Sequence, residues 1–159
     1  GSSLDYLIID MPPGTGDIQL SLAQNIGVSG ALIVTTPQDI ALADVRRGLE
    51  MFNKVGIPII GVVENMSVHV CSECGHKEAV FGTGGADKLA MDYGIDVIER
   101  VPLDVRIREQ TDKCKPVVAS SCVNDVGASY MSLSRSLHSI VQSEDFSDDS
   151  VPEIVIKDN

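Results

Sequence analysis

Hydrophobic and polar residues follow two different patterns along this chain. Four short runs are almost continuously apolar, at residues 4–10, 30–36, 57–64 and 95–101. Such runs are typical of parallel strands, which are covered by other elements on both faces of their sheet. The pattern therefore predicts four buried parallel strands.

The segments between these runs carry apolar residues at helical spacing. Val45, Leu49 and Phe52 recur at i, i+4 and i+7, which predicts a helix from Asp39 to about Val55. Further helices are predicted over about 17–26, 84–93, 102–111 and 125–141. Strand and helix thus alternate, which predicts a doubly wound α/β fold with a mostly parallel sheet and right-handed crossovers.

Composition agrees with this fold class and suggests a domain division. Of the 159 residues, 43% are hydrophobic and only 4% are aromatic, so the core must consist mainly of aliphatic side chains. This length suits one compact domain, which we place at residues 1–142. Residues 143–159 carry six acidic residues and one lysine, and we expect them to form a disordered acidic tail.

The charge balance argues against two classes of partner. A net charge of −11 opposes binding to nucleic acid or to an anionic membrane surface. No apolar run approaches the ~20 residues that span a bilayer, so we expect no membrane insertion. The four cysteines are too few for a disulfide scaffold, and two of them are closely spaced, which indicates a reducing compartment.

The end of the first predicted strand carries a candidate nucleotide site. Asp10 closes that strand, and the loop MPPGTGD follows it. An acid at a strand end can hold Mg²⁺ or cap the next turn, and a glycine-rich loop lets backbone N–H groups approach a phosphate. Ligands of such sheets bind at the carboxyl ends of the strands. Other candidates at these ends are Asp39, Asn65, Pro102 and Asp104, of which Asp39 is explained nearly as well by helix capping.

A second candidate site lies in residues 68–82, which we expect to form a loop that interrupts the strand–helix alternation. Cys71 and Cys74 are three positions apart and can bind one metal with little strain. Thiolates suit zinc and iron–sulfur clusters, and both sites usually have four ligands. His69 and His76 could complete a zinc site within the chain. A redox pair and an inert pair are the remaining alternatives.

Several motifs together carry a family resemblance. LDYLIIDMPPGTGD, IVTTPQDIAL, GVVENMS, the C-x-x-C loop and VPLD occur in this order. The set resembles the Mrp/ApbC family of P-loop NTPases, which is related to the MinD ATPases and acts as iron–sulfur cluster scaffolds or carriers. The strings VENMSV-x-x-C-x-x-C-x-H-K and FG-x-x-G-A-x-K-L-A are similar to the mitochondrial branch that assists complex I assembly. The resemblance covers about residues 4–140.

The resemblance implies a role for each nucleotide-site candidate. Asp10 would be the Walker B acid near Mg²⁺, and hence the catalytic residue. Gly14 would be the switch glycine near the γ-phosphate of ATP. Asn65 would recognise the edge of the adenine base, and Pro102 and Asp104 would line the pocket around the base.

The resemblance also implies a metal centre and partners. Cys71 and Cys74 would bind a [4Fe–4S] cluster shared across a homodimer, with zinc as the alternative metal. The cluster would pass to apo iron–sulfur recipient proteins. The implied compartment is the mitochondrial matrix or the cytoplasm.

The chain departs from the family in one respect. The Walker A loop G-x-x-x-x-G-K-[ST] does not occur in it. We therefore expect an N-terminally truncated domain that does not hydrolyse ATP alone, although the full-length parent would be a slow ATPase. The family places the strand leading to Walker A between the strands at 4–10 and 30–36. Those two strands are therefore expected to leave a gap, pair directly or borrow a strand.

Overall fold

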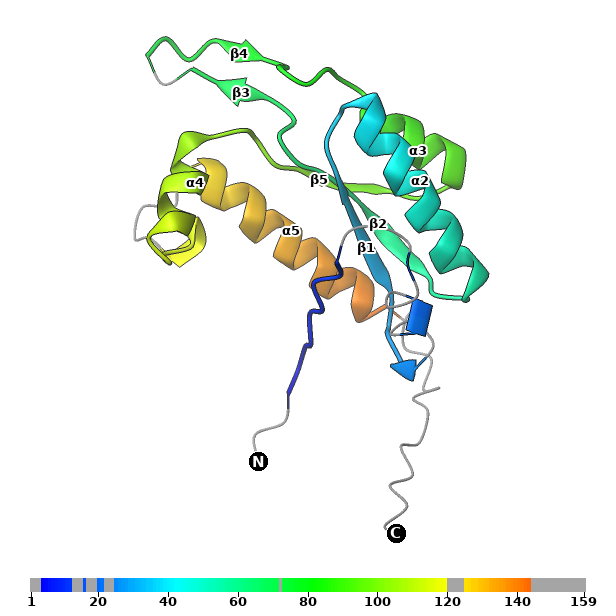
Figure 1. Cartoon of the computed structure of the whole chain (residues 1–159). Coiled ribbons are helices and arrows are strands. Elements are labelled where there is room, and N and C mark those ends of the chain that lie inside the picture. The colour runs from blue at the N-terminus through cyan, green and yellow to red at the C-terminus, as the bar shows by residue number, and fades with distance from the viewer. Residues whose placement is uncertain are drawn as a thin grey trace.

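A computed structural model describes residues 4–12, 16, 20–21, 25–71, 73–119 and 125–143. Its centre is a parallel sheet in the order β1-β2-β5 (Figure 1). These strands are β1 (Ala31–Thr35), β2 (Ile59–Glu64) and β5 (Val97–Arg100). Three of the four predicted strands are therefore confirmed, and the α/β fold with a parallel sheet is confirmed with them.

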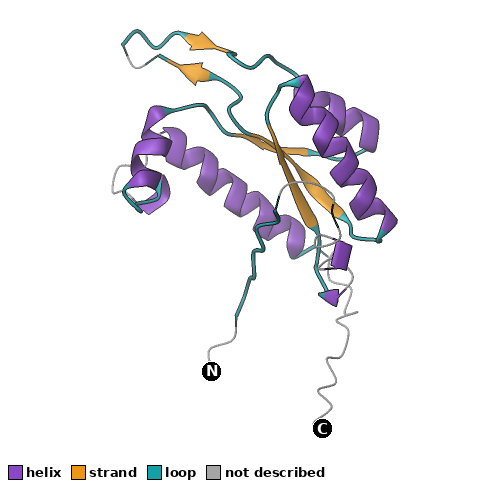
Figure 2. Cartoon of the chain, in the orientation of Figure 1, coloured by secondary structure: helices purple, strands orange, loops and turns teal. Residues whose placement is uncertain are grey.

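Helices cover both faces of this sheet (Figure 2). Helices α2 (Asp39–Lys54) and α3 (Gly85–Tyr93) lie on one face, and α5 (Asp125–Val141) lies on the other. The short helix α4 (Val105–Asp112) and the 3₁₀ turn η1 (Val117–Ala119) lead from β5 toward α5. Helix on both faces is the arrangement that a buried parallel sheet requires.

The core lies between the sheet and the pair α2–α3. Leu49 of α2, Val62 of β2 and Leu89 of α3 are fully buried there. The expected apolar stripe of α2 is confirmed, since Val45 and Phe52 pack against the same cluster. Burying one such aliphatic side chain stabilises a fold by roughly 1.5–3 kcal/mol.

The predicted strand at residues 4–10 is wrong. Residues 4–12 form no strand, and Leu4, Leu7 and Ile8 are 73%, 71% and 88% exposed. A strand needs a neighbour for its backbone hydrogen bonds, and no described segment pairs with the outer edge of β1. The expected direct pairing of the runs at 4–10 and 30–36 does not occur among the described residues. The segment instead contacts α5 through Tyr6, whose hydroxyl lies 2.5 Å from Nδ1 of His138.

The loop predicted at 68–82 contains a short antiparallel hairpin. Strand β3 (His69–Val70) pairs with β4 (Lys77–Glu78). In Figure 1 this hairpin extends away from the sheet and its helices. Its two-residue strands are too short to produce a recognisable alternation in the sequence, which is why they were not predicted.

The other expectations have mixed outcomes. The helices expected at 84–93, 102–111 and 125–141 are confirmed with small shifts at their ends. Most of the helix expected at 17–26 lies outside the described residues, and so does the tail from residue 144 onward. Within the described ranges, no helix is both long and apolar enough to cross a membrane.

Candidate functional site

The two candidate cysteines lie in the turn of the β3–β4 hairpin. The Cys71 N–H donates to the His76 carbonyl at 2.9 Å, and the Gly75 N–H donates to the Cys71 carbonyl at 2.9 Å. Gly75 has φ +72°, a conformation that glycine adopts without strain. The backbone therefore closes a compact turn that brings the thiols of Cys71 and Cys74 to one end of the hairpin.

Both thiols are accessible, and the pKa of one of them is lowered. Cys74 is exposed and Cys71 is partly exposed, and neither forms a disulfide. The pKa of Cys71 is lowered chiefly by a hydrogen bond from the backbone N–H of Cys74, then by that of Glu73 and by the Cys74 side chain. Because the thiolate is the form that binds metals, this turn favours metal binding.

The described residues of the hairpin contribute two thiols as candidate metal ligands. Among the residues that the structure describes, no three His, Cys, Asp or Glu side chains converge on a point where they could hold a metal. His69 Nδ1 lies 3.2 Å from the Leu103 carbonyl oxygen, and His76 is exposed. The Cys₂His₂ site considered from the sequence is therefore not assembled in this part of the chain.

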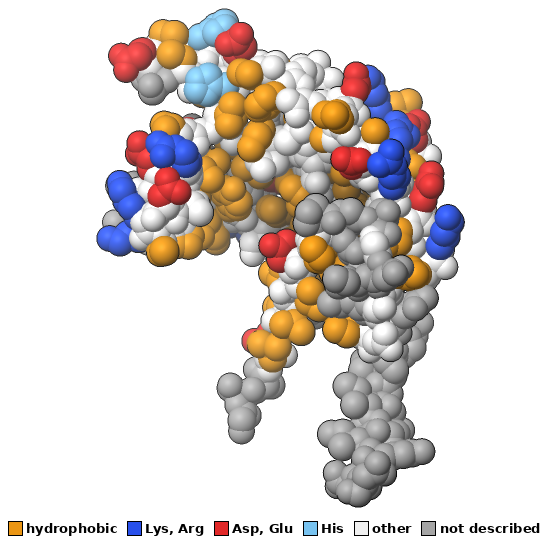
Figure 3. Space-filling view, viewed as in Figure 1, with side chains coloured by type: hydrophobic (Ala, Val, Ile, Leu, Met, Phe, Trp, Pro, Cys, Tyr) orange, Lys and Arg blue, Asp and Glu red, His pale blue; other side chains and the backbone are white. Residues whose placement is uncertain are grey.

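Figure 3 shows the surroundings of the thiols on the molecular surface. The hairpin stands clear of the rest of the molecule, and imidazole and carboxylate side chains gather on it. Glu73, His76 and Glu78 are all exposed there. A partner molecule can therefore reach Cys71 and Cys74 without displacing other parts of the fold.

The second candidate site is the carboxyl edge of the sheet, where Asn65 follows β2. The Asn65 N–H donates to the Thr35 carbonyl at 2.7 Å, which places the ends of β1 and β2 side by side. The Asn65 side-chain oxygen accepts from the N–H of Met66 at 2.9 Å, and Met66 has φ +55°. Asn65 thus lies in a tight turn at the edge where a parallel sheet binds its ligands.

Pro102 and Asp104 lie at the same edge, after β5. The Asp104 carboxylate caps α4 by accepting from the Arg106 N–H at 2.8 Å, and it pairs with the Arg106 guanidinium at 2.5 Å. The side chain of Asp104 is only 10% exposed. The hydrogen bonds and charge of Arg106 hold the pKa of Asp104 below its usual range, despite partial burial. The start of α4 is therefore held in place by the bonds between the Asp104 carboxylate and Arg106.

The remaining nucleotide candidates have different outcomes, and only Asp39 follows the end of a strand as expected. Asp39 is exposed and is the first residue of α2, while Gln38 is the N-cap and makes no side-chain cap. Asp39 therefore stabilises the helix through its dipole instead of capping it. Asp10 is exposed, and its expected place at the end of a buried strand is wrong because 4–12 form no strand. Gly14 lies outside the described residues.

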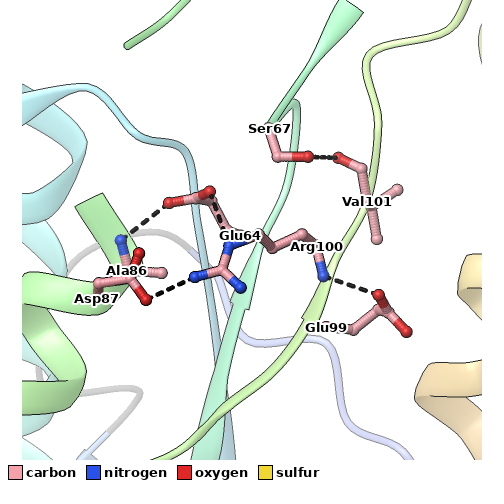
Figure 4. A network of polar contacts seen from close by, with 7 residues as sticks. All are labelled: Glu64, Ser67, Ala86, Asp87, Glu99, Arg100 and Val101. Carbon is pink, nitrogen blue, oxygen red and sulfur yellow. Dashed lines mark hydrogen bonds and ion pairs between the residues drawn. The ribbon is translucent and has the colours of Figure 1, made fainter. Parts of the chain in front are cut away.

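One buried acid was missed from the sequence. Glu64, the last residue of β2, is 3% exposed, and its carboxylate accepts from the Ala86 N–H of α3 at 2.9 Å (Figure 4). Arg100 of β5 lies 3.5 Å from the same carboxylate and 2.6 Å from that of Asp87. The first turn of α3 has no other side-chain cap, because Gly84 is its N-cap. The signal in the sequence was an acid ending an apolar strand, the same signal that singled out Asp10.

Comparison with known proteins identifies a family that matches this chain. Residues 2–138 match the profile of a family described as "ParA: NUBPL iron-transfer P-loop NTPase". The chain belongs to this family. The match spans all the described strands and includes the C-x-x-C hairpin.

Individual relatives of this iron-transfer family agree with that assignment. The chain is 58% identical over 130 residues to the iron-sulfur cluster carrier protein of Escherichia coli, covering 82% of this chain and 35% of the relative. It is 55% identical over 128 residues to the mouse iron-sulfur cluster transfer protein NUBPL, covering 80% and 40%. It is 49% identical over 134 residues to the Arabidopsis thaliana iron-sulfur protein required for NADH dehydrogenase, mitochondrial, covering 84% and 43%.

Solved structures support the fold. The nucleotide-binding protein from Archaeoglobus fulgidus, in complex with ADP, matches with a TM-score of 0.59 and 39% identity, covering 69% of this chain and 45% of that one. The cell division ATPase MinD of Pyrococcus furiosus matches with a TM-score of 0.56 and 21% identity, covering 70% and 43%. The chain therefore has a partial MinD-like domain and spans less than half the length of these proteins.

Proposed function

We propose that this chain is the thiol-bearing part of an iron–sulfur cluster carrier. It binds the cluster as cargo through Cys71 and Cys74 and passes it to apo recipient proteins. The observation that carries this proposal is the hairpin turn, which presents two accessible thiols and lowers the pKa of Cys71. The names of the relatives, a cluster carrier protein and a cluster transfer protein, are in line with it.

The number of thiols suggests how the cargo is held. A [4Fe–4S] cluster takes four thiolates, and each hairpin supplies two. We infer that two copies of the chain meet at their hairpins and share one cluster. Transfer would then be ligand exchange, in which each iron–thiolate bond to Cys71 or Cys74 breaks as a recipient thiolate takes its place. Such exchange needs exposed ligands, and Cys74 is exposed.

The carboxyl edge of the sheet suggests a nucleotide site in the whole protein. The solved relative from Archaeoglobus fulgidus is a complex with ADP. We propose that Asn65 and the segment from Pro102 to Asp104 contribute to the base-binding side of such a site, with Asp39 nearby at the start of α2. Asp10 and Gly14 would serve Mg²⁺ and phosphate. Since this chain has no G-x-x-x-x-G-K-[ST] loop, we expect no ATP hydrolysis by it alone.

The test is anaerobic reconstitution with iron and sulfide, followed by visible absorbance and iron analysis. Cys71→Ser and Cys74→Ser should each abolish the charge-transfer absorbance, because one thiolate per chain cannot retain a cluster. Cys114→Ser is the matched control. Cys114 is also an exposed free thiol but lies after α4, away from the hairpin, so this change should leave the absorbance unaltered.

Two results would reject the proposal. One is a folded wild-type chain that takes up stoichiometric zinc and no iron–sulfur cluster, which would favour a zinc-stabilised module for partner binding. The other is equal cluster loss in the Cys114→Ser control, which would show that the absorbance does not report on the hairpin.

A further inference from the structure

The hairpin that carries the thiols is joined to the sheet by a continuation of the β2–β5 pairing. Beyond the ends of these strands, the Ser67 N–H donates to the Val101 carbonyl at 3.0 Å, and the Leu103 N–H donates to the Val68 carbonyl at 2.9 Å. Ser67 adds a side-chain bond to the same Val101 carbonyl at 3.1 Å (Figure 4). Residues 67–69 therefore run beside residues 101–103 as far as the first residue of β3.

The last contact of this ladder is made by His69. Its backbone forms an isolated parallel bridge with Leu103, and its Nδ1 lies 3.2 Å from the Leu103 carbonyl oxygen. A carbonyl oxygen can only accept a hydrogen bond, so Nδ1 carries the proton and donates it. His69 is partly buried, in contrast to the exposed His76 on the other side of the thiols. The imidazole is therefore engaged with the fold and is not free to point at the thiols through Nδ1.

The hairpin itself has little to hold it in place. Its strands consist of two residue pairs, His69 with Glu78 and Val70 with Lys77, and both β4 residues are exposed. A two-stranded hairpin is marginally stable at best without support from another element. The hairpin must therefore be ordered by the residues that join it to the sheet, which are 67–69 and 101–103. Among them, His69 is the first residue of β3.

We propose that His69 is a positioning residue for the cysteine pair. By donating to the Leu103 carbonyl it fixes the start of β3, and thereby the direction in which Cys71 and Cys74 are presented. The contact also ties the hairpin to the segment that runs through Pro102 to the α4 cap at Asp104. A shift of that segment is therefore transmitted to the thiols. The inference deepens the proposed cluster function, but its structural part stands without it.

Three substitutions isolate the contact. His69→Ala removes the donor. His69→Asn restores an N–H donor at nearly the same number of bonds from the backbone, because the Asn amide nitrogen occupies the place of Nδ1. His76→Ala is the matched control, since it removes an imidazole from the same hairpin on the exposed side.

The first measurement is hydrogen exchange of the hairpin amides in the metal-free protein, at Cys71 and Gly75, whose N–H groups close the turn. His69→Ala should speed this exchange about fivefold, the effect of losing one typical hydrogen bond. His69→Asn should return most of the protection, and His76→Ala should leave it unchanged. In reconstituted protein, the rate of iron loss to a chelator should follow the same order.

Several results would overturn the proposal. Unchanged exchange in His69→Ala would show that the contact does not order the hairpin. Equal effects of His69→Ala and His76→Ala would point to a general loss of imidazole. If His69→Ala speeds iron loss but not exchange, and His69→Asn does not rescue, then His69 acts as a ligand. A wild-type chain that binds no cluster rejects the proposed function, while the exchange experiment still decides the role of His69.

Discussion

Among single residues, Asp104 is a candidate binding residue whose carboxylate already stabilises the fold. Its carboxylate caps α4 and pairs with Arg106, and only a tenth of the side chain is exposed. Removal of such a cap typically costs about 1 kcal/mol. We expect Asp104→Ala to lower the free energy of unfolding at neutral pH by roughly this amount, measured by urea denaturation.

The same residue predicts a dependence on pH. The pKa of Asp104 is held down in the folded state, mainly by hydrogen bonds from Arg106, whereas in the unfolded chain it has the ordinary value of about 3.9. A depressed carboxyl pKa gives stability that is present above the unfolded value and is lost as pH falls through the folded value. The difference between wild type and Asp104→Ala should therefore narrow as pH falls below about 4.

Asp112→Ala is the control for this experiment. Asp112 ends the same helix, but its side chain is 63% exposed and pairs with Arg108 across one turn. Surface pairs of this kind contribute little, so we expect a small change in stability. A difference between wild type and Asp104→Ala that stays constant from pH 7 down to strongly acidic conditions would contradict the assigned role.

At the scale of elements, the contact between α3 and the loop that follows β1 depends on the absence of one side chain. A Cβ atom at Gly85 would lie 2.8 Å from both the Cα and the carbonyl oxygen of Pro37. Both are backbone atoms and cannot rotate away. We expect Gly85→Ala to displace α3 and to cost about 1–3 kcal/mol, as overpacking usually does. Thermal unfolding measures the effect.

For Gly48→Ala in the neighbouring helix α2, we expect the opposite effect on thermal stability. Gly48 lies inside α2, and a Cβ there would meet nothing within 4 Å. Alanine is favoured over glycine in a helix by roughly 0.5–1 kcal/mol, so this variant should unfold at a higher temperature than wild type. Equal shifts of the same sign in the two variants would show that the close approach of Gly85 to Pro37 does not limit the packing.

Elements with a local hydrophobic pattern were predictable from the sequence. The runs at 30–36, 57–64 and 95–101 became β1, β2 and β5 because each finds a parallel neighbour and a helix to cover it. The run at 4–10 is also largely apolar but has no partner strand in the described part of the chain, so its backbone could not enter the sheet. The apolar residues of a run indicate which side chains a strand would bury. The strand forms only where its backbone can pair with a neighbouring strand.

The candidate site was predictable only in part, for a related reason. The spacing of Cys71 and Cys74 identified the thiols, since both ligands lie within one local motif. The link from His69 to Leu103 and the link from Glu64 to Ala86 join residues 34 and 22 positions apart. No local pattern reports such pairs. They became visible only when β2, β5 and α3 were packed together.

At the scale of the whole molecule, charge opposes the association that the proposed cargo requires. Each chain carries a net charge of −11, so two copies repel one another unless something bridges them. Their hairpins supply two thiols each, which is half of what a [4Fe–4S] cluster needs. The cluster would itself be the bridge, and the dimer should therefore depend on it.

This gives a prediction for the state of assembly. We expect the metal-free chain to be a monomer of 16.9 kDa and the reconstituted protein to be a dimer with about four iron atoms per two chains. Because the repulsion is between exposed charges, raising the ionic strength from 0.01 to 0.15 M should stabilise the loaded dimer, since the screening length falls from about 30 to 8 Å. Light scattering coupled to size-exclusion chromatography, with iron analysis of each peak, measures both quantities.

The control for assembly is the Cys74→Ser variant, which leaves the formal net charge unchanged but has one hairpin thiol. It should remain a monomer after the same treatment at either ionic strength. A wild-type dimer that persists after iron is removed by a chelator would show that protein contacts, and not the shared cargo, hold the two copies together. A loaded monomer with four iron atoms per chain would place the missing ligands within one chain and exclude the shared site.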